Sequence, residues 1–276
     1  MSLENIRRRL EALNRQPLPT ELGSEDTASN ARHRVGARTD LEALIDGSEW
    51  EAPAGPCYRV LRRLARSWPS RPDIGARLGG ALHGTDPGDD RLDPDLVACV
   101  EAGVEALLFV DLETCGFAGT PVFLVGTLYH DGTDLIAEQL LARTYEEESA
   151  IVARVAQLAA DRRLLITFNG KTFDWPFLRD RASVHRIDLV EPVHHCDLLH
   201  VVRRRYRHIL PDCKLQTLEV FVCRRRRQGD IAGADIPAAY HDYVRTGDAR
   251  LIKEVVHHNY LDLVTLADLL IDRLGG

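Results

Sequence analysis

The chain of 276 residues is 45% hydrophobic and carries a formal net charge of −7. This hydrophobic content is ample for a core and argues against disorder throughout, while the length fits one large domain or two small ones. The net negative charge argues against a whole surface that binds polyanions. No run of about 18 apolar residues is present to span a membrane, and the first residues lack the apolar centre of a signal peptide. We therefore expect no membrane association and a cytoplasmic location.

The first hundred residues (1–100) are predicted to form an N-terminal helix followed by an irregular extension. Residues 2–15 have apolar side chains at helical spacing, and residues 16–49 are polar, with prolines typical of an arm or linker. Residues 50–68 fit either a strand or a helix, and the pattern does not decide between them. The main domain is predicted to cover residues 101–276.

That domain is predicted to begin with a buried strand that ends in two acids. A short helix over residues 96–104 leads into Leu107–Val110, a continuous apolar run typical of a strand buried on both faces. Asp111 and Glu113 follow. Because residues two apart in a strand share a face, we expect their carboxylates to point the same way. Residues 114–116 then turn the chain away.

The following elements predict an α/β fold, with a mixed β-sheet flanked by helices and a helical C-terminal part. Residues 122–129 and 135–141 are the next two strands, and the Asp131-Gly132 pair between them is a hairpin signal. Residues 145–160 have apolar side chains at helical spacing. Residues 164–168 form a strand after this helical crossover and should lie parallel to the first strand. Three antiparallel strands are therefore followed by parallel ones.

A second acidic element follows the strand over residues 164–168. Asp174 lies in the first turn of the next helix, five residues after Asn169. By itself, Asp174 could simply stabilise the helix N-terminus. Because its strand should neighbour the first one, however, Asp174 can approach Asp111 and Glu113.

A third acidic element lies in the predicted helix over residues 249–274. His258 and Asp262 are four residues apart and therefore share a helix face. A His four residues before an Asp is commonly only a surface or core pair. The pair gains meaning only together with the two acidic elements before it.

Positive charge is concentrated in residues 201–227, which contain nine Lys or Arg residues and two acids. Such a cluster is typical of a surface beside a phosphate backbone. Lys occurs only three times in the whole chain, however, so an arginine-favouring coding bias is an equally good explanation. Phosphate contact by this segment stays one of two alternatives.

Together these motifs resemble a known family, the DEDD 3′–5′ exonucleases of the ribonuclease-H-like superfamily, and most closely its bacterial YprB-like branch. The resemblance covers about residues 107–274 and implies a mixed sheet flanked by helices and hydrolysis of nucleic-acid phosphodiester bonds with two divalent metal ions. The matching segments are DLETCG (Asp111–Gly116), FLVG (Phe123–Gly126), TFNGKTFDWPFL (Thr167–Leu178), CDLLHVVRR (Cys196–Arg204), CKLQTLE (Cys213–Glu219), GDIAGADIPAAYHDYVRTGD (Gly229–Asp248) and HNYLDLVTLADLL (His258–Leu270).

The resemblance also implies roles for individual residues. His258 would be the general base, although His257 is a rival, because related exonucleases place a Tyr four residues or a His five residues before the last Asp. Asp197 is instead interpreted as a helix cap outside the metal set. The remaining roles fall to four metal-binding acids (Asp111, Glu113, Asp174 and Asp262) and to three residues beside the nucleic-acid strand (Thr114, Asn169 and Lys171).

On electrostatic grounds the four acids must bind cations or stay partly protonated. Carboxylates about 6 Å apart repel by roughly 3 kcal/mol per pair at an effective dielectric constant near 20. Summed over the pairs, this rivals the stability of a whole domain, about 5–15 kcal/mol. Oxygen ligands without paired Cys or His suit Mg²⁺ or Mn²⁺ better than zinc.

The sequence therefore predicts a metal-dependent 3′–5′ exonuclease that acts on single-stranded or frayed DNA or RNA with a free 3′ end. Two alternatives stay open. The same core could serve a structure-specific endonuclease, because an open groove around it permits internal cleavage. From a different class, the chain could be a nucleic-acid-binding module whose active site has lapsed.

Overall fold

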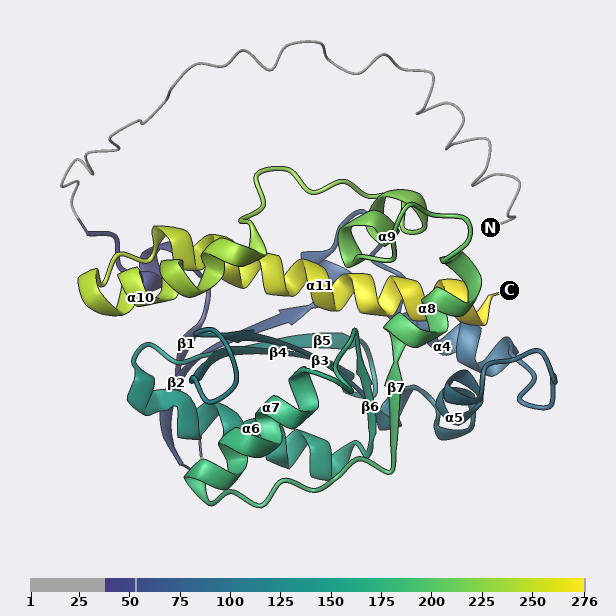
Figure 1. The fold of residues 1–276 in the computed structure, drawn as a ribbon, viewed down its shortest axis with the longest axis horizontal. Helices are drawn as coiled ribbons and strands as arrows, with labels where there is room; N and C mark the ends of the chain where they lie inside the picture. The colour runs from purple at the N-terminus through teal and green to yellow at the C-terminus, as the bar shows by residue number, and fades with distance from the viewer. Residues whose placement is uncertain (1–37, 53, 276) are drawn as a thin grey trace, which may run out of the picture.

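The computed structural model describes residues 38–52 and 54–275. The helix predicted over residues 2–15 and most of the predicted arm lie outside this part of the chain. A seven-stranded sheet in the order β1-β2-β5-β4-β3-β6-β7 forms the centre of the fold (Figure 1). Its strands are β1 (Ser48–Ala52), β2 (Gly55–Arg63), β3 (Leu107–Thr114), β4 (Val122–His130), β5 (Leu135–Leu141), β6 (Leu164–Thr167) and β7 (His194–Asp197).

The predicted strand pairing is confirmed around the central strand β3. β3 runs antiparallel to β4, and β4 runs antiparallel to β5. β6 lies parallel to β3 on its other side. β7 extends the sheet in parallel beyond β6 and was not predicted, because its sequence His194-His195-Cys196-Asp197 lacks the apolar run of a buried strand. The sheet is thus mixed, with an antiparallel half and a parallel half.

Residues 48–52 and 55–63 of the predicted irregular extension belong to this sheet, which corrects that prediction. The open alternative for residues 50–68 is thereby decided for a strand as far as Arg63, before a short helix over residues 64–67. β1 and β2 form an antiparallel hairpin, and β2 pairs with β5. Along β2, Tyr58 and Val60 are buried while the arginines between and after them are more exposed. This alternation is typical of a strand with one face toward a core. The many arginines hid the pattern from a reading based on apolar runs.

Helices cover both faces of the sheet (Figure 1). α6 and α7 pack on one face, and the long helix α11 crosses the other face with α4 and α8 beside it. The helices are α2 (Leu41–Leu44), α3 (Leu64–Ser67), α4 (Ile74–Gly84), α5 (Pro94–Ala102), α6 (Glu148–Asp161), α7 (Asp174–His185), α8 (Leu198–Tyr206), α9 (Leu215–Phe221), α10 (Ile236–Thr246) and α11 (Arg250–Leu274), with 3₁₀ turns η1 (Val104–Ala106), η2 (Tyr145–Glu147) and η3 (Gly233–Asp235).

The alternation of β3 decides which helix its acids face. Leu107 and Phe109 belong to the hydrophobic cluster that contains the second half of α11, whereas Leu108 and Val110 belong to the cluster that contains α6. Odd-numbered residues of β3 therefore point toward α11. Asp111 continues this odd series, and so does the acid two residues later.

Candidate active site

Asp111 is held in place by α11 through a buried amide. The Nδ2 group of Asn259 donates to Oδ2 of Asp111 at 2.8 Å and to its backbone oxygen at 3.2 Å. Asn259 is in turn fixed by Gln139 of β5, whose Nε2 donates to Oδ1 of Asn259 at 2.8 Å. Gly126 lies opposite Asp111 on β4, and a Cβ atom there would come within 2.1 Å of the Asn259 Oδ1. The glycine therefore permits the close approach that brings α11 to the acids.

Asp174 reaches the same region from α7, after a tight turn. Asn169 begins this turn in the left-handed region, with φ of 66°. The carboxylate of Asp197 accepts the backbone N–H of Asn169 at 2.7 Å and that of Lys171 at 3.1 Å. Asp197 also caps α8 by accepting the N–H of Leu199 at 3.0 Å. The predicted cap is thus confirmed, and it also fixes the turn that leads to Asp174.

α11 contributes His258 and Asp262 to the same place. Nε2 of His258 lies 3.4 Å from Oδ2 of Asp262. One ligand atom from each of Glu113, His258 and Asp262 lies within 4.8 Å of the others. His257 is exposed on the neighbouring helix position and does not belong to this group. Of the two predicted candidates for the base, the structure brings only His258 to the acids.

The pKa values of the acids show that their charges act on one another. Burial raises the pKa of Asp111 well above its ordinary value, and the charges of Asp262, Glu113 and Asp174 raise it further. Burial followed by the charges of Asp262 and Asp174 raises the pKa of Glu113. Burial also raises the pKa of Asp174 to about 7, partly offset by backbone hydrogen bonds. Three segments far apart in sequence therefore place their acids within mutual electrostatic reach.

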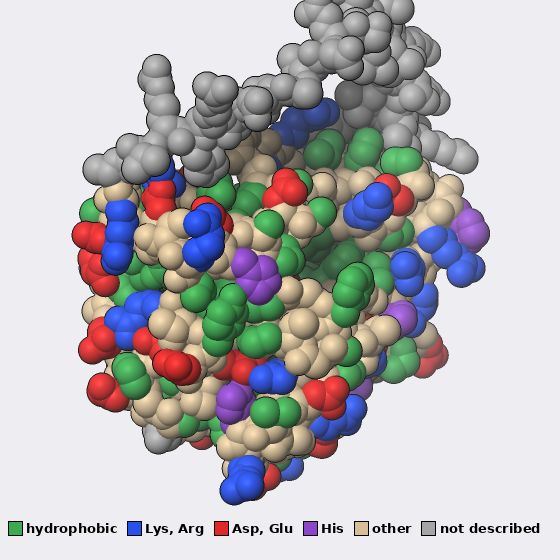
Figure 2. Space-filling view, turned by 60° about the vertical axis from the view of Figure 1, so that its left-hand side comes forward, with side chains coloured by type: hydrophobic (Ala, Val, Ile, Leu, Met, Phe, Trp, Pro, Cys, Tyr) green, Lys and Arg blue, Asp and Glu red, His purple; other side chains and the backbone are tan. Residues whose placement is uncertain are grey.

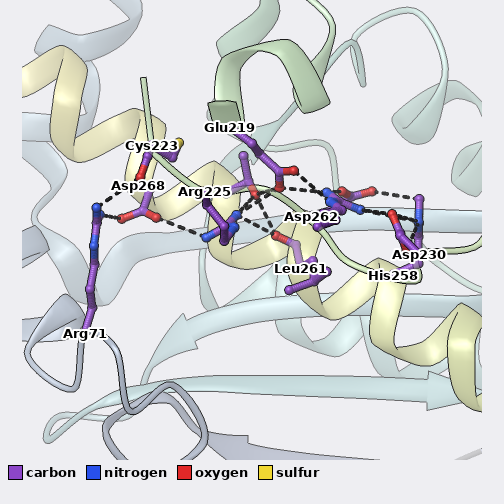
Figure 3. A network of polar contacts seen from close by, with 11 residues as sticks. Arg71, Glu219, Cys223, Arg225, Asp230, His258, Leu261, Asp262 and Asp268 are labelled. Carbon is purple, nitrogen blue, oxygen red and sulfur yellow. Dashed lines mark hydrogen bonds and ion pairs between the residues drawn. The ribbon is translucent and has the colours of Figure 1, made fainter. Parts of the chain in front are cut away.

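A loop between α9 and α10 adds residues that sequence reasoning missed (Figure 3). Arg227 contacts Asp262, donates to Glu219 of α9 at 2.7 and 2.8 Å, and lies 3.0 Å from Asp230. Asp230 in turn lies 2.9 Å from Nδ1 of His258. One signal for two of these residues was present in the sequence. Asp230 is the second residue of the matching segment that begins GDIAGADIP, and Glu219 is the last residue of CKLQTLE. Neither segment had been given a role.

The basic segment over residues 201–227 supplies internal ion pairs as well as surface charge. Arg225 and Arg227 both bind the buried Glu219, and Arg204 binds Asp93. The face shown in Figure 2 has acidic and basic side chains interspersed rather than one continuous basic patch. Phosphate contact by this segment stays a prediction, and two of its arginines have a structural function.

The three residues predicted to lie beside a nucleic-acid strand differ in their exposure. Thr114 is buried, and its hydroxyl donates to the backbone oxygen of Gly116 at 2.8 Å. Asn169 is exposed, and so is Lys171, whose Nζ lies 3.5 Å from a carboxylate oxygen of Asp95. Asn169 and Lys171 are therefore accessible to a ligand, whereas the Thr114 side chain is engaged within its own turn.

Comparison with known proteins agrees with this geometry. A family model described as the RNase_H superfamily matches residues 108–273, so the chain belongs to that superfamily. The fold and the family model thus define the class of protein, a member of the ribonuclease-H-like superfamily.

Among curated proteins, the chain is similar to the uncharacterized protein YprB of Bacillus subtilis (strain 168), with 32% identity over 172 residues. That match covers 60% of this chain and 41% of YprB, so the chain corresponds to less than half of its relative. Among solved structures, a family B DNA polymerase from the hyperthermophilic archaeon Pyrobaculum calidifontis matches with a TM-score of 0.46 and 15% identity, over 59% of this chain and 24% of that one. Likeness at this level carries no functional argument.

The residues present fit a divalent cation. Nucleases of this superfamily generally use divalent metals, and the tight group of Glu113, His258 and Asp262 offers two carboxylates and one imidazole. Asp111 and Asp174 lie beside the group and share its electrostatic penalty. Carboxylate-rich sites of this kind suit Mg²⁺ or Mn²⁺. Among the described residues, no helix is long and apolar enough to cross a membrane.

Proposed function

We propose that this protein is a 3′–5′ exonuclease of the DEDD type that hydrolyses single-stranded or frayed DNA or RNA with two Mg²⁺ or Mn²⁺ ions. The observation that carries the proposal is the convergence of the acids. Glu113 and Asp262 lie in one tight group with His258, and the charge of Asp262 raises the pKa of Asp111, Glu113 and Asp174. These acids lie close together although their charges repel one another. Raised pKa values of this kind are typical of active sites.

In this proposal the acids hold the ions and α11 supplies the proton acceptor. Asp111, Glu113, Asp174 and Asp262 are the ligands. When bound, a pair of divalent ions lowers the pKa of a water and stabilises the leaving oxygen. His258 takes the proton from that water, since imidazole changes its charge near neutral pH. Asn169 and Lys171, both exposed beside the acids, contact the substrate strand together with the Thr114 turn.

The decisive substitution is Asp174→Asn. It removes one ligand but keeps the size of the side chain, so we expect metal-dependent hydrolysis of an end-labelled oligonucleotide to fall at least a hundredfold. The melting temperature in EDTA should stay the same or rise, because a buried charge with a raised pKa is removed. Asp180→Asn is the matched control, since Asp180 is an exposed acid on the same helix. Undiminished cleavage by the Asp174 variant would rule the scheme out.

The two alternatives are separated by the same assay with different substrates. A substrate blocked at both ends resists an exonuclease and is cut by a structure-specific endonuclease. A lapsed binding module would leave every substrate intact at all Mg²⁺ and Mn²⁺ concentrations. It is disfavoured because all four acids are present and the charge of Asp262 raises the pKa of the other three.

A further inference from the structure

The loop over residues 222–232 carries two charged side chains toward α11, and neither was given a function above. Arg227 and Asp230 lie three residues apart, and both contact the α11 helix at the proposed active site. Figure 3 shows Asp230 beside His258. Their side chains are 6% and 10% exposed. Buried charges are retained in proteins when they are paired, and this pair meets the ring of His258.

We propose that Asp230 is a positioning residue that fixes the tautomer and orientation of His258, an inference that rests on the proposed nuclease function. Both carboxylate oxygens of Asp230 lie 2.9 Å from Nδ1 of His258. An ionised carboxylate can only accept hydrogen bonds, so Nδ1 carries the proton. The lone pair of the neutral ring is therefore on Nε2.

This tautomer directs the free lone pair into the acidic group. Nε2 lies 3.4 Å from Oδ2 of Asp262, and the ring belongs to the tight group with Glu113. A lone pair facing carboxylate oxygens is favourable only if a proton, a water or a cation lies between them. The position is thus the one that a group accepting a proton from a bound water requires.

Arg227 holds Asp230 in this position and offers the competing arrangement. Its Nη1 group lies 3.0 Å from Asp230 and 3.3 Å from Nδ1 of His258. A bond from Arg227 to Nδ1 would require the other tautomer, with the proton on Nε2. The two contacts to Asp230 at 2.9 Å are shorter, and they select the tautomer with Nδ1 protonated. Glu219 also binds Arg227 and fixes its orientation. The carboxylate of Asp230 therefore decides which tautomer of His258 is favoured.

The test uses Asp230→Asn in the full chain. The Asn amide offers donors as well as an acceptor, so together with Arg227 it can donate to Nδ1 and drive the proton to Nε2. We expect kcat on a single-stranded oligonucleotide to fall about 10–100-fold, with KM within a factor of three of the wild type. Asp230→Glu, which keeps the carboxylate, should recover part of the lost kcat. Asp235→Asn, an exposed acid in η3, is the matched control.

The tautomer itself is measured by ¹⁵N NMR of histidine-labelled protein in metal-free buffer, at a pH where the ring signals no longer change. Wild type should show Nδ1 protonated and Nε2 unprotonated, and the Asn variant should show a shift toward the opposite form. A wild-type ring protonated on Nε2 overturns the proposal, even if the Asn variant does not fold. An Asn variant with unchanged kcat and tautomer overturns it as well.

This readout separates the inference from the function on which it rests. If the wild type does not hydrolyse nucleic acid, the proposed function fails while the NMR result still decides the role of Asp230. Titration of Mn²⁺ by calorimetry is the remaining check. The Asn variant should bind Mn²⁺ with a dissociation constant within threefold of the wild type, and loss of binding would instead make Asp230 part of the metal site.

Discussion

This protein buries acids in two different surroundings. Glu219 lies among arginines, whereas Asp174 lies among other acids. Glu219 is 1% exposed, yet two arginines lower its pKa below the ordinary value against the effect of burial. Asp174 is 6% exposed, and its pKa rises to about 7 because burial and neighbouring acids outweigh its backbone hydrogen bonds. Equal burial thus has opposite consequences. A paired acid is part of the framework, whereas an acid that lies among other acids marks a site.

Asp262 lies between these two surroundings. Burial raises its pKa, while Arg227 and then His258 act to lower it. It therefore contacts both surroundings. It lies in one group with Glu113, and it forms an ion pair with Arg227, which also binds Glu219. Helix α11 thus presents the carboxylate of Asp262 both to other acids and to an arginine. Each prediction below tests one of these two surroundings.

The largest expected effect on stability comes from breaking the ion pairs of Arg227 with Glu219 and Asp230. Arg227→Ala leaves Glu219 and Asp230 without their shared cation, and removing one partner of a buried ion pair costs about 3–5 kcal/mol. We expect the free energy of unfolding in urea to fall by that amount. Arg226→Ala, at the exposed neighbouring position, should change it by less than about 0.5 kcal/mol. Equal effects of the two substitutions would contradict the buried role of Arg227.

A smaller effect is expected from pH, with opposite sign for the acids in the two surroundings. The folded state keeps the proton of Asp174 up to about pH 7, whereas the unfolded chain loses it near its ordinary pKa of 3.8. Stability in EDTA should therefore be full below pH 4 and fall by roughly 2–4 kcal/mol as the pH rises through 7. Glu219, with a lowered pKa, instead contributes stability above its ordinary pKa of 4.5 that is lost on acidification.

Unfolding in EDTA between pH 4.5 and 8 measures this slope. Asp174→Asn should flatten the fall toward neutral pH, because the titrating group is gone. A wild-type protein that gains stability steadily from pH 5 to 8 in EDTA would contradict the raised pKa of the acidic group.

The smallest of these effects concerns the contact that brings α11 to β3. Gly126→Ala places a methyl group 2.1 Å from Oδ1 of Asn259, so the amide that holds Asp111 must move. Overpacking of this kind costs about 1–3 kcal/mol, and we expect weaker Mn²⁺ binding with it. Gly80→Ala in α4, where nothing lies within 4 Å of the added methyl, should be neutral or stabilising by up to about 1 kcal/mol. Unchanged Mn²⁺ binding in the Gly126 variant would separate Asn259 from the site.

Sequence patterns predicted the parts of the fold that rest on continuous apolar runs. β3, β4 and β5 carry such runs, and their order, pairing and parallel neighbour β6 are confirmed. β1, β2 and β7 lack them, because charged or histidine side chains interrupt their apolar residues. Strands of this kind, two of them at the edges of the sheet, are recognised only once the strands that pair with them are known.

The residues of the candidate site also differ in how far the sequence could predict their positions. Asp111 and Glu113 lie in the buried strand β3, and Asp174 comes shortly after the neighbouring strand β6. Their approach could therefore be predicted from the sheet alone. Glu219 and Asp230 come from a helix end and an irregular loop, whose path depends on packing against α11 rather than on any local period. No spacing in the sequence indicates that Asp230 meets His258, or which of the eight arginines in residues 201–227 binds Glu219 and Asp262.

The central claim is that acids from β3, α7 and α11 together bind hard cations. Calorimetric titration of Mn²⁺ into the full chain tests it most directly. We expect saturable binding of two ions to the wild type in the millimolar range or tighter, and loss of at least one of them in Asp174→Asn. No measurable heat of binding up to millimolar Mn²⁺, or binding that the substitution leaves unchanged, would contradict the claim.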